Sequence, residues 1–412
     1  MDVPCIRTKI RRNLAQLFIA EALIMIEKAL HGGKGYWTWV IFLVAGVGLG
    51  LSAYLYQLQE GLWLTGMSRN VSWGFYISQF TFLVGVAASV LMVVLPLYLH
   101  DFKAFAPITA LAQFLTVGTL MMSLLFIFSD VGMPMRILNV PLNPTPGSML
   151  FYDTIFLPGF MLINLVIGWT AVGVEKRHTS LPPWVKFLIY VSFPWAVVMH
   201  TVTAFIYAGT PGRGFWMTAI MAPRFLTTAF AAGCAILILL SLVLRPLARF
   251  DAGEKAIQKL VTIMFYALII NAFFLAVEYF TAFYSHVPAY SETFRYLFFG
   301  IDGNTAFVPW FWVMNLAILG AIALLAFPGV RSNHLRLSEA CVVALVGLWI
   351  DKGFLLVPAA FIPNVFGRIM EYPPSWVELT VSLGIYCLGM LLVTALYKVI
   401  IAVRGEGYLS SS

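Results

Sequence analysis

Ionisable side chains interrupt otherwise apolar stretches of this sequence, and their chemistry needs an explanation. His200, Arg224 and Glu278 lie on three consecutive stretches, at a similar distance from the connections that join them. Such groups are costly away from water, so they are usually paired or functional. Pairing among the three would lower that cost. Two interpretations stay open: an ion-paired network that only orients helices, or a relay that moves protons.

A second polar group lies in the first half of the chain, near the ends of apolar stretches. A quinone head group needs hydrogen-bond partners for two carbonyl oxygens, a residue that exchanges protons and an apolar path for its tail. This group supplies those residue types, although Glu60 and Asp153 also suit an ordinary membrane interface. Its members are Gln57, Glu60, Ser78, Gln79, Asp130, Tyr152 and Asp153.

Asp351 and Lys352 form a third polar position, because they interrupt a late apolar stretch side by side. Neighbouring residues on a helix point about 100° apart, so the two need not pair with each other. We expect at least one of them to face a neighbouring helix, in a structural or a proton-conducting role.

The elements that must position these residues follow from the composition. Of the 412 residues, 61% are hydrophobic and 10% are charged, whereas a soluble domain carries roughly 25% charged residues. Such a chain is expected to be covered by lipid, and its net charge of +7 then reflects membrane topology rather than nucleic-acid binding. Since a spanning helix needs about 20 apolar residues, we predict an all-α membrane protein with ten transmembrane helices. They are expected at 37–59, 73–99, 106–129, 151–174, 184–208, 216–244, 258–285, 305–327, 337–360 and 376–402.

The positions of the basic residues test that count. Of the 25 lysine and arginine residues, only Arg224 and Lys352 fall well inside the predicted helices, away from their ends. If the N-terminus lies inside, all but five of the others fall at inner connections, as the positive-inside rule requires. The pattern predicts a multi-pass protein of the cytoplasmic membrane with both termini cytoplasmic. The five outer residues are Arg69, Arg136, Arg213, Arg295 and Arg368.

The outer connections 130–150, 286–304 and 361–375 are long and rich in proline, glycine and aromatic residues. Structured loops of this kind suit the docking of another protein. Packing against lipid head groups is the alternative interpretation.

Residues 1–34 precede the first predicted helix. Ile10, Leu14 and Leu17 recur at helical spacing among basic residues, so we expect an amphipathic cytoplasmic segment on the inner membrane face. An upstream extension, with Met25 as the true start, is the alternative. Residues 35–412 are expected to form one ten-helix membrane domain.

The histidines and cysteines give little sign of a bound metal. A transmembrane b-haem needs two facing axial ligands, and His200 with His286 is the only conceivable pair. The four cysteines lack the spacing of an iron–sulfur or zinc site. We therefore expect no haem, iron–sulfur cluster or other metal in this chain.

Several motifs together resemble the NrfD/PsrC family of membrane quinone oxidoreductase subunits. Residues 61–77 read GLWLTGMSRNVSWGFYI and continue into FLVGVAA at 82–88. Further matching motifs are DVGMPMR at 130–136, SFPW at 192–195 followed by HTV at 200–202, and APRF at 222–225. The late motifs WIDK at 349–352 and EYPPSWVE at 371–378 resemble the ten-helix branch of the family.

Within the family, MIEKAL at 25–30 and YWTW at 36–39 most resemble the DsrP branch. These are the quinone-interacting subunits of the DsrMKJOP complexes of sulfur-metabolising prokaryotes, and they imply a role in dissimilatory sulfur metabolism and sulfate reduction. The membrane subunit of menaquinone reductase (Qrc) complexes is the next most similar branch.

The resemblance implies two four-helix bundles, helices 2–5 and 6–9, flanked by helices 1 and 10. It implies menaquinone as a bound substrate near the outer face of the first bundle, and no haem or iron–sulfur cluster in this chain. It implies partners: a periplasmic-side ferredoxin-like subunit with [4Fe–4S] clusters, and other membrane and multihaem cytochrome subunits. The chain would be a subunit of the oxidoreductase and not catalytic alone.

The resemblance also assigns residue roles. Asp130, His200 and Asp153 would exchange protons with the quinone, and Gln57, Tyr76, Gln79 and Tyr152 would line its pocket. Arg224, Glu278 and Asp351 would form a proton path in the second bundle. Some members place a histidine on the first helix near the quinone, where this chain has Tyr54, Tyr56 and Gln57.

Two other function classes compete with a quinone role. An ion transporter would explain the buried charges of the second half, although the sequence does not show the paired broken helices that usually mark a transport site. A membrane anchor that only positions its partners is the third hypothesis.

Overall fold

The computed structural model describes residues 32–177, 179, 181–248, 250–364 and 366–410. The predicted amphipathic segment at 1–34 lies almost entirely outside these residues. Apart from one isolated bridge between Ile301 and Asn304, the described residues form helices and their connections.

Ten helical spans in the described part of the chain are long and apolar enough to cross a membrane, which confirms the predicted count. Six are single helices: α2 (Lys34–Glu60), α7 (Met149–Arg177), α8 (Pro183–Ala208), α9 (Met221–Ala248), α10 (Glu254–Ser285) and α12 (Val308–Ala326). Two more are α5 (Ala106–Asp130), preceded by the short η2 (Lys103–Phe105), and α15 (Trp376–Ser410).

The second and ninth spans are interrupted, which the sequence did not reveal. The second consists of α3 (Phe75–Ala87) and α4 (Ser89–Leu99), and Thr116 of α5 donates a hydrogen bond to the Ala87 carbonyl at the break. The ninth consists of α14 (His334–Ile350), a π-helical turn η5 (Asp351–Leu355) and η6 (Pro358–Phe361). Although far apart in sequence, α3 and η5 pack against each other.

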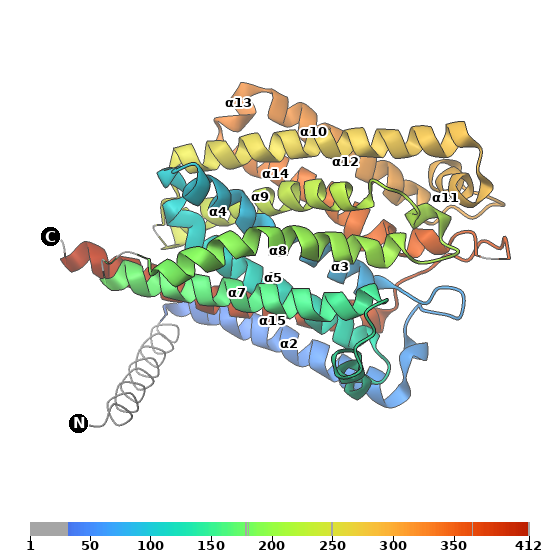
Figure 1. Ribbon diagram of the computed structural model, residues 1–412, viewed down its shortest axis with the longest axis horizontal. Coiled ribbons are helices and arrows are strands. Elements are labelled where there is room, and N and C mark those ends of the chain that lie inside the picture. Colours follow the sequence, from blue (N-terminus) through green and yellow to red (C-terminus); the bar gives the residue numbers. More distant parts are fainter. Residues whose placement is uncertain (1–31, 178, 180, 249, 365, 411–412) are drawn as a thin grey trace.

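Short elements occupy the connections at the two ends of the molecule (Figure 1). The end that carries α11 (Pro288–Phe299) also holds η1 (Leu62–Leu64), η3 (Pro134–Leu138), α6 (Asn139–Leu142) and η4 (Gly214–Trp216), and we call it the α11 end. The opposite end carries α13 (Pro328–Arg331), the start of α2 and the end of α15.

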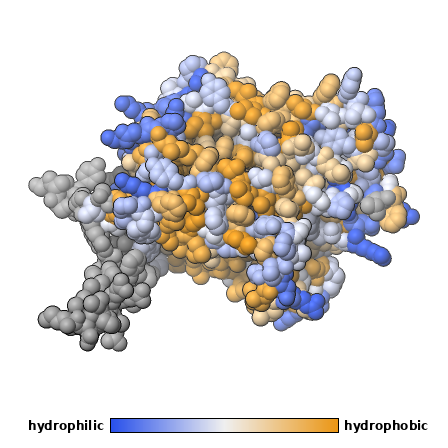
Figure 2. Space-filling view, in the orientation of Figure 1, coloured by the Kyte–Doolittle hydropathy of each residue, from blue (hydrophilic) through white to orange (hydrophobic). Residues whose placement is uncertain are grey.

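The outer surface of the helices is apolar. Phe42, Phe187, Phe273 and Leu316 lie on four different spans and are each at least 60% exposed. Figure 2 shows hydrophobic residues across the middle of the molecule, with hydrophilic residues gathered at its two ends. Such a band is the surface expected of a protein whose solvent is lipid.

The helices α3, α5, α7 and α8 pack on one another, as do α9, α10, α12 and α14, and α3 and α8 contact α9 between the two sets. The expected division into two four-helix bundles remains a prediction. The first and last spans, α2 and α15, lie side by side, and α15 also packs on α5 and α7.

Small residues allow α2 and α15 to approach closely. Gly46 and Gly50 lie four residues apart on the buried side of α2. A Cβ atom built on Gly50 would lie 2.4 Å from the Gly384 Cα of α15, and one on Gly46 would lie 2.4 Å from the Cys387 Sγ. Pairs of small residues at this spacing are a common packing device in membranes, where close backbone approach replaces the hydrophobic driving force.

Replacement of Gly50 by valine should therefore separate α2 from α15. Overpacking of this kind typically costs about 1–3 kcal/mol, and we expect a lower midpoint in a thermal-unfolding assay followed by fluorescence-detected size exclusion. The matched control is Gly48→Val, since a Cβ atom on Gly48 meets nothing within 4 Å. Equal midpoints for the two variants would contradict the packing described here.

Candidate functional site

The π-helical turn η5 places Asp351 and Lys352 inside the protein. The Leu356 N–H donates to the Asp351 carbonyl, five residues back, at 2.9 Å. Both side chains are 3% exposed. Single π-helical turns inside α-helical spans occur often at functional sites.

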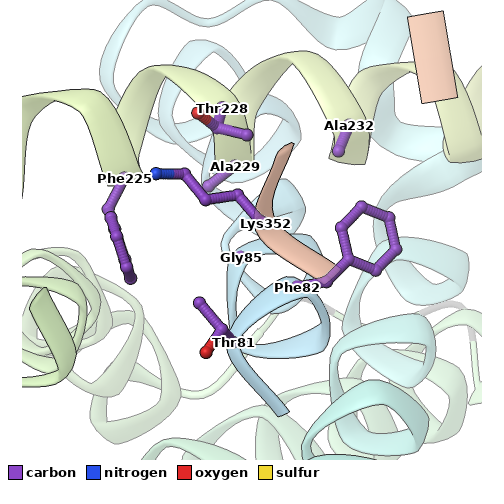
Figure 3. A pocket seen from close by; sticks show the side chains of 8 residues that line it. All are labelled: Thr81, Phe82, Gly85, Phe225, Thr228, Ala229, Ala232 and Lys352. Carbon is purple, nitrogen blue, oxygen red and sulfur yellow. The ribbon is translucent and has the colours of Figure 1, made fainter. Parts of the chain in front are cut away.

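Lys352 borders a small cavity between η5, α3 and α9 (Figure 3). Its volume is about 10 Å³, and it is lined by Thr81, Phe82, Gly85, Phe225, Thr228, Ala229, Ala232 and Lys352. The Lys352 Nζ lies 4.2 Å from the centre of the Phe225 ring, a geometry that stabilises an ammonium group.

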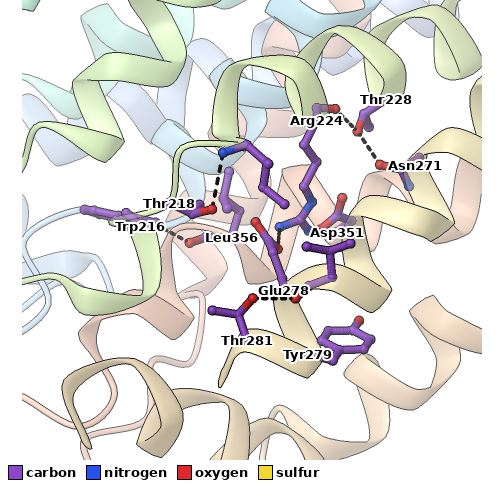
Figure 4. Close-up of polar contacts among 12 residues, drawn as sticks. Trp216, Thr218, Arg224, Thr228, Asn271, Glu278, Tyr279, Thr281, Asp351 and Leu356 are labelled. Atoms are coloured by element: carbon purple, nitrogen blue, oxygen red, sulfur yellow. Dashed lines mark hydrogen bonds and ion pairs between the residues drawn. The ribbon is translucent and has the colours of Figure 1, made fainter. Parts of the chain in front are cut away.

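Arg224 is held between two carboxylates inside the second half (Figure 4). Its Nη1 donates to the Glu278 Oε2 of α10, and its Nη2 donates to the Asp351 Oδ1 at 2.5 Å. The Lys352 Nζ lies 4.0 Å from the other oxygen of Asp351. We call Arg224, Glu278, Asp351 and Lys352 the charge cluster; its formal charges sum to zero, and each member is at most 4% exposed.

Part of the hydrogen-bonding capacity of the charge cluster is unused. The Arg224 Nε, Glu278 Oε1, Asp351 Oδ2 and Lys352 Nζ are buried and form no hydrogen bond within the described residues. Buried polar atoms of this kind often mark positions for water or for a transferred proton. The positive and negative charges of the cluster therefore balance, and four of its polar atoms can still bind water or a transferred proton.

The predicted meeting of His200 with Arg224 and Glu278 is only partly correct. Arg224 and Glu278 do pair, but the third partner is Asp351 rather than His200. The His200 Nδ1 lies 2.9 Å from the Ala196 carbonyl of its own helix. A carbonyl oxygen can only accept, so Nδ1 carries a proton, and Nε2 has no hydrogen-bond partner in the part that the structure describes.

Gln57, Tyr76 and Asp130 lie near one another at the α11 end of the first half. The Tyr76 hydroxyl donates to the Gln57 Oε1 at 2.6 Å, and the Gln57 Nε2 donates to the Ser129 carbonyl at 2.9 Å. Asp130 follows Ser129 and interacts electrostatically with Tyr76, as does Tyr54. The Asp130 Oδ1 and the Tyr54 hydroxyl are buried and have no hydrogen-bond partner within the described ranges.

Asp153 and Tyr152 lie at the start of α7. The Asp153 Oδ1 accepts a hydrogen bond from the Thr203 hydroxyl of α8 at 2.9 Å. Tyr152 is half-buried and its ring meets that of Phe151 edge to face at 5.4 Å.

Gln79 joins the two halves instead of facing the Gln57–Tyr76 pair. Its Nε2 donates to the Gly353 carbonyl in η5 at 2.5 Å. Its Oε1 accepts from the Trp349 Nε1 at 3.0 Å and from the Tyr386 hydroxyl at 2.7 Å. With both lone pairs of Oε1 engaged, Gln79 has little capacity left to bind a ligand.

Glu378 stabilises the start of α15, a role that was not predicted from the sequence. It is fully buried at the start of α15. Its Oε2 accepts from the Gly66 N–H at 2.7 Å and from the Ser375 N–H at 2.8 Å, while its Oε1 accepts from the Tyr372 hydroxyl. The sequence signal was the Ser375-x-x-Glu378 capping box, a reciprocal pattern that starts helices.

Tyr372 extends this network to the start of α3. Its hydroxyl oxygen accepts from the Phe75 N–H at 2.8 Å. Burial and the neighbouring Glu378 carboxylate raise the pKa of Tyr372 far above its usual value, so the hydroxyl stays protonated as a donor. A Cβ atom on Gly74 would lie 2.5 Å from that oxygen, which explains a glycine at this position.

No group of three or more His, Cys, Asp or Glu side chains is arranged to hold a metal ion among the residues that the structure describes.

Comparisons with known proteins agree with this architecture. The family model "Polysulphide reductase, NrfD" matches residues 63–364. A putative dimethyl sulfoxide reductase membrane subunit of Halobacterium salinarum is 27% identical over 401 residues, covering 88% of this chain and 90% of that protein. The Hdr-like menaquinol oxidoreductase integral membrane subunit of Archaeoglobus fulgidus is 22% identical, covering 87% and 91%. The menaquinone reductase integral membrane subunit of Nitratidesulfovibrio vulgaris is 20% identical, covering 88% and 91%.

The charge cluster predicts a sharp effect of Arg224→Met. This change leaves two buried carboxylates without their main partner, and breaking a buried ion pair in this way costs about 3–5 kcal/mol. We expect a large loss of folded protein in membranes, measured by fluorescence-detected size exclusion. Arg295→Met removes an exposed arginine and should have little effect. Normal accumulation of the Arg224 variant would refute the stabilising role of the ion pairs in the charge cluster.

Proposed function

Because this chain belongs to the polysulphide reductase NrfD family, membrane subunits of quinone oxidoreductase complexes, we propose that it exchanges electrons between menaquinol or menaquinone and an iron–sulfur partner. Two of the relatives carry menaquinol or menaquinone in their names. The observation that carries the proposal is the group formed by Tyr54, Gln57, Tyr76 and Asp130.

The chemistry of that group suits a quinone head. The unpartnered Tyr54 hydroxyl can donate to one quinone carbonyl, and the Tyr76 hydroxyl can turn from Gln57 to another. The open oxygen of Asp130 can accept a proton from a quinol hydroxyl. Tyr54 and Gln57 occupy the stretch where some family members have a histidine, so these two residues take the place of that ligand.

The iron–sulfur partner is proposed to dock at the α11 end. Met135, Leu142 and Phe366 are exposed there, each by more than 70%, beyond the ends of the spanning helices. Large exposed apolar side chains outside the lipid layer favour a protein partner over head groups. A periplasmic-side ferredoxin-like subunit with [4Fe–4S] clusters would bring its clusters to the same end as Asp130.

The finer assignments belong to this proposal as well. A DsrP-type role in a DsrMKJOP complex, with multihaem cytochrome partners, rests on the motifs near the first span, and a Qrc-type complex is the alternative. A location in the cytoplasmic membrane with both termini cytoplasmic agrees with the start of α2 and the end of α15 lying at one end of the molecule.

Asp130→Asn and Tyr76→Phe test the quinone site. Loss of one hydrogen bond or proton acceptor in the transition state should lower menaquinol oxidation by the assembled complex by about tenfold or more. The measurement is electron transfer from a short-chain menaquinol to the iron–sulfur partner. Glu339→Gln, exposed on α14, serves as the control, and wild-type rates in both test variants would refute the site.

Proton translocation is a second proposed activity. It is based on the charge cluster, which lies inside the second half and shares no residue with the proposed quinone site. Arg224, Glu278 and Asp351, named from the sequence, form one connected network. Its open carboxylate oxygens are suited to receiving protons. Ionisable residues buried in a membrane domain are functional candidates by default, which favours proton chemistry over a membrane anchor.

Glu278→Gln tests the second activity. The variant should reduce proton movement per electron in proteoliposomes that carry the complex, while quinol oxidation in the presence of an uncoupler continues. An internal pH indicator measures the protons, and Glu339→Gln, exposed on α14, is the control. Unchanged proton movement in the Glu278 variant would argue for a structural role alone.

A further inference from the structure

The cavity at Lys352 lies where the two halves of the protein meet. Thr81 and Gly85 border it from α3 in the first half, and Phe225 and Thr228 border it from α9 in the second (Figure 3). Its volume of about 10 Å³ is at the lower limit for holding one water molecule. Because the Lys352 Nζ faces this region and forms no hydrogen bond within the described residues, a water there would have a polar partner on the second-half side.

Thr81 supplies the first-half side of the cavity. Its hydroxyl contacts the hydroxyl of Tyr207 on α8 and donates to the Ile77 carbonyl at 2.8 Å. A threonine on a helix has two accessible side-chain rotamers. Rotation about its Cα–Cβ bond can therefore carry the Thr81 hydroxyl from Tyr207 to the cavity.

Tyr207 is fully buried in an aromatic enclosure. Its ring lies 5.1 Å from Trp216, 5.9 Å from Trp73 and 5.9 Å from Phe225, measured between ring centres. The enclosure excludes bulk water, and within it the Tyr207 hydroxyl is hydrogen-bonded to the Thr81 hydroxyl. Neither residue belongs to the quinone site or to the charge cluster.

One helical turn before Tyr207 on the same face of α8, Thr203 donates to the Asp153 carboxylate. A series of polar side chains thus runs from Asp153 through Thr203, and one turn further along α8 through Tyr207, to Thr81 and the cavity, which Lys352 borders.

We propose that the Tyr207–Thr81 hydroxyl pair and a water in this cavity carry protons between Asp153 in the first half and Lys352 in the second. This inference rests on the proposed function, which supplies the protons by quinol oxidation. Each hydroxyl and the water accept one proton and pass one on. A protonated Asp153 becomes a carboxylate, the neutral Lys352 amine becomes an ammonium, and no electron moves.

Lys352 suits the receiving end of this connection. When its amine is neutral, the charge cluster carries one more negative than positive charge. A proton arriving at the Nζ restores the balance, with the ammonium stabilised by Asp351 at 4.0 Å and by the Phe225 ring. Proton transfer through the cavity would thereby link the charge cluster to Asp153 in the first half.

Thr81→Val and Tyr207→Phe each remove one hydroxyl and little else. In proteoliposomes carrying the complex and oxidising a short-chain menaquinol, we expect both variants to lower the number of protons moved per electron at least about threefold. Quinol oxidation with an uncoupler should stay near the wild-type rate, because neither residue contacts the quinone site. A wild-type ratio of protons to electrons in both variants would overturn the proposal.

The controls remove comparable hydroxyls elsewhere. Thr109 is buried and donates to a carbonyl of its own helix at 2.9 Å, and Tyr397 is buried and donates to the Leu111 carbonyl at 2.9 Å. Thr109→Val and Tyr397→Phe should keep the wild-type ratio. If they lower it as much as the test variants do, the effect is a general loss of packing and the proposal is overturned.

A second measurement separates this proposal from the proposed function. A high-resolution cryo-EM map of the intact complex should show water density within hydrogen-bond reach of the Lys352 Nζ, and that density should weaken in the Thr81→Val complex. A dry cavity in the wild-type map would overturn the connection whatever the complex oxidises. A wild-type complex that does not react with menaquinol would refute the proposed function, and the map would still decide whether the cavity is hydrated.

Discussion

The cost of burying charge in a lipid-facing protein determines the arrangement of the second half. An isolated ion in such a place costs several kcal/mol even after the protein relaxes. Arg224 is tolerated because α10 brings Glu278 to one side of its guanidinium and η5 brings Asp351 to the other. Three elements must therefore meet at one point, so the cluster constrains how α9, α10 and the ninth span pack.

The interruption of the ninth span makes this meeting possible. A wide π-helical turn directs Asp351 and Lys352 into the interior and leaves the Gly353 carbonyl free to accept from Gln79. The Leu356 carbonyl similarly accepts from the Trp216 Nε1 at 2.8 Å. The same turn thus presents charge to the second half and hydrogen-bond acceptors to its neighbours, which is why α3 packs on it so closely.

Gln79 and Asp351 illustrate how far the sequence could be interpreted. A glutamine two turns into an apolar helix indicated an important polar position, but not its partners. Those lie at Trp349, Gly353 and Tyr386, roughly 300 positions away in the chain, and their geometry makes Gln79 a connector between the halves. The depth of Arg224 and Glu278 on adjacent helices was enough to predict their pairing. The pairing of Asp351 with Arg224 could not be predicted from the sequence, because the direction of the Asp351 side chain depends on a π-helical turn that no local sequence pattern indicates.

The sequence by itself determined the number of spans, their order and the family, because apolar length, turn residues and contiguous motifs are local properties of the chain. It also determined which polar residues are too costly to be accidental. Only the tertiary structure decided which of them meet: Arg224 with Asp351 rather than His200, Tyr76 with Gln57, and Glu378 with Tyr372. The physical reason is that hydrogen bonds and ion pairs act over a few ångströms, and distances on that scale are set by how the helices pack.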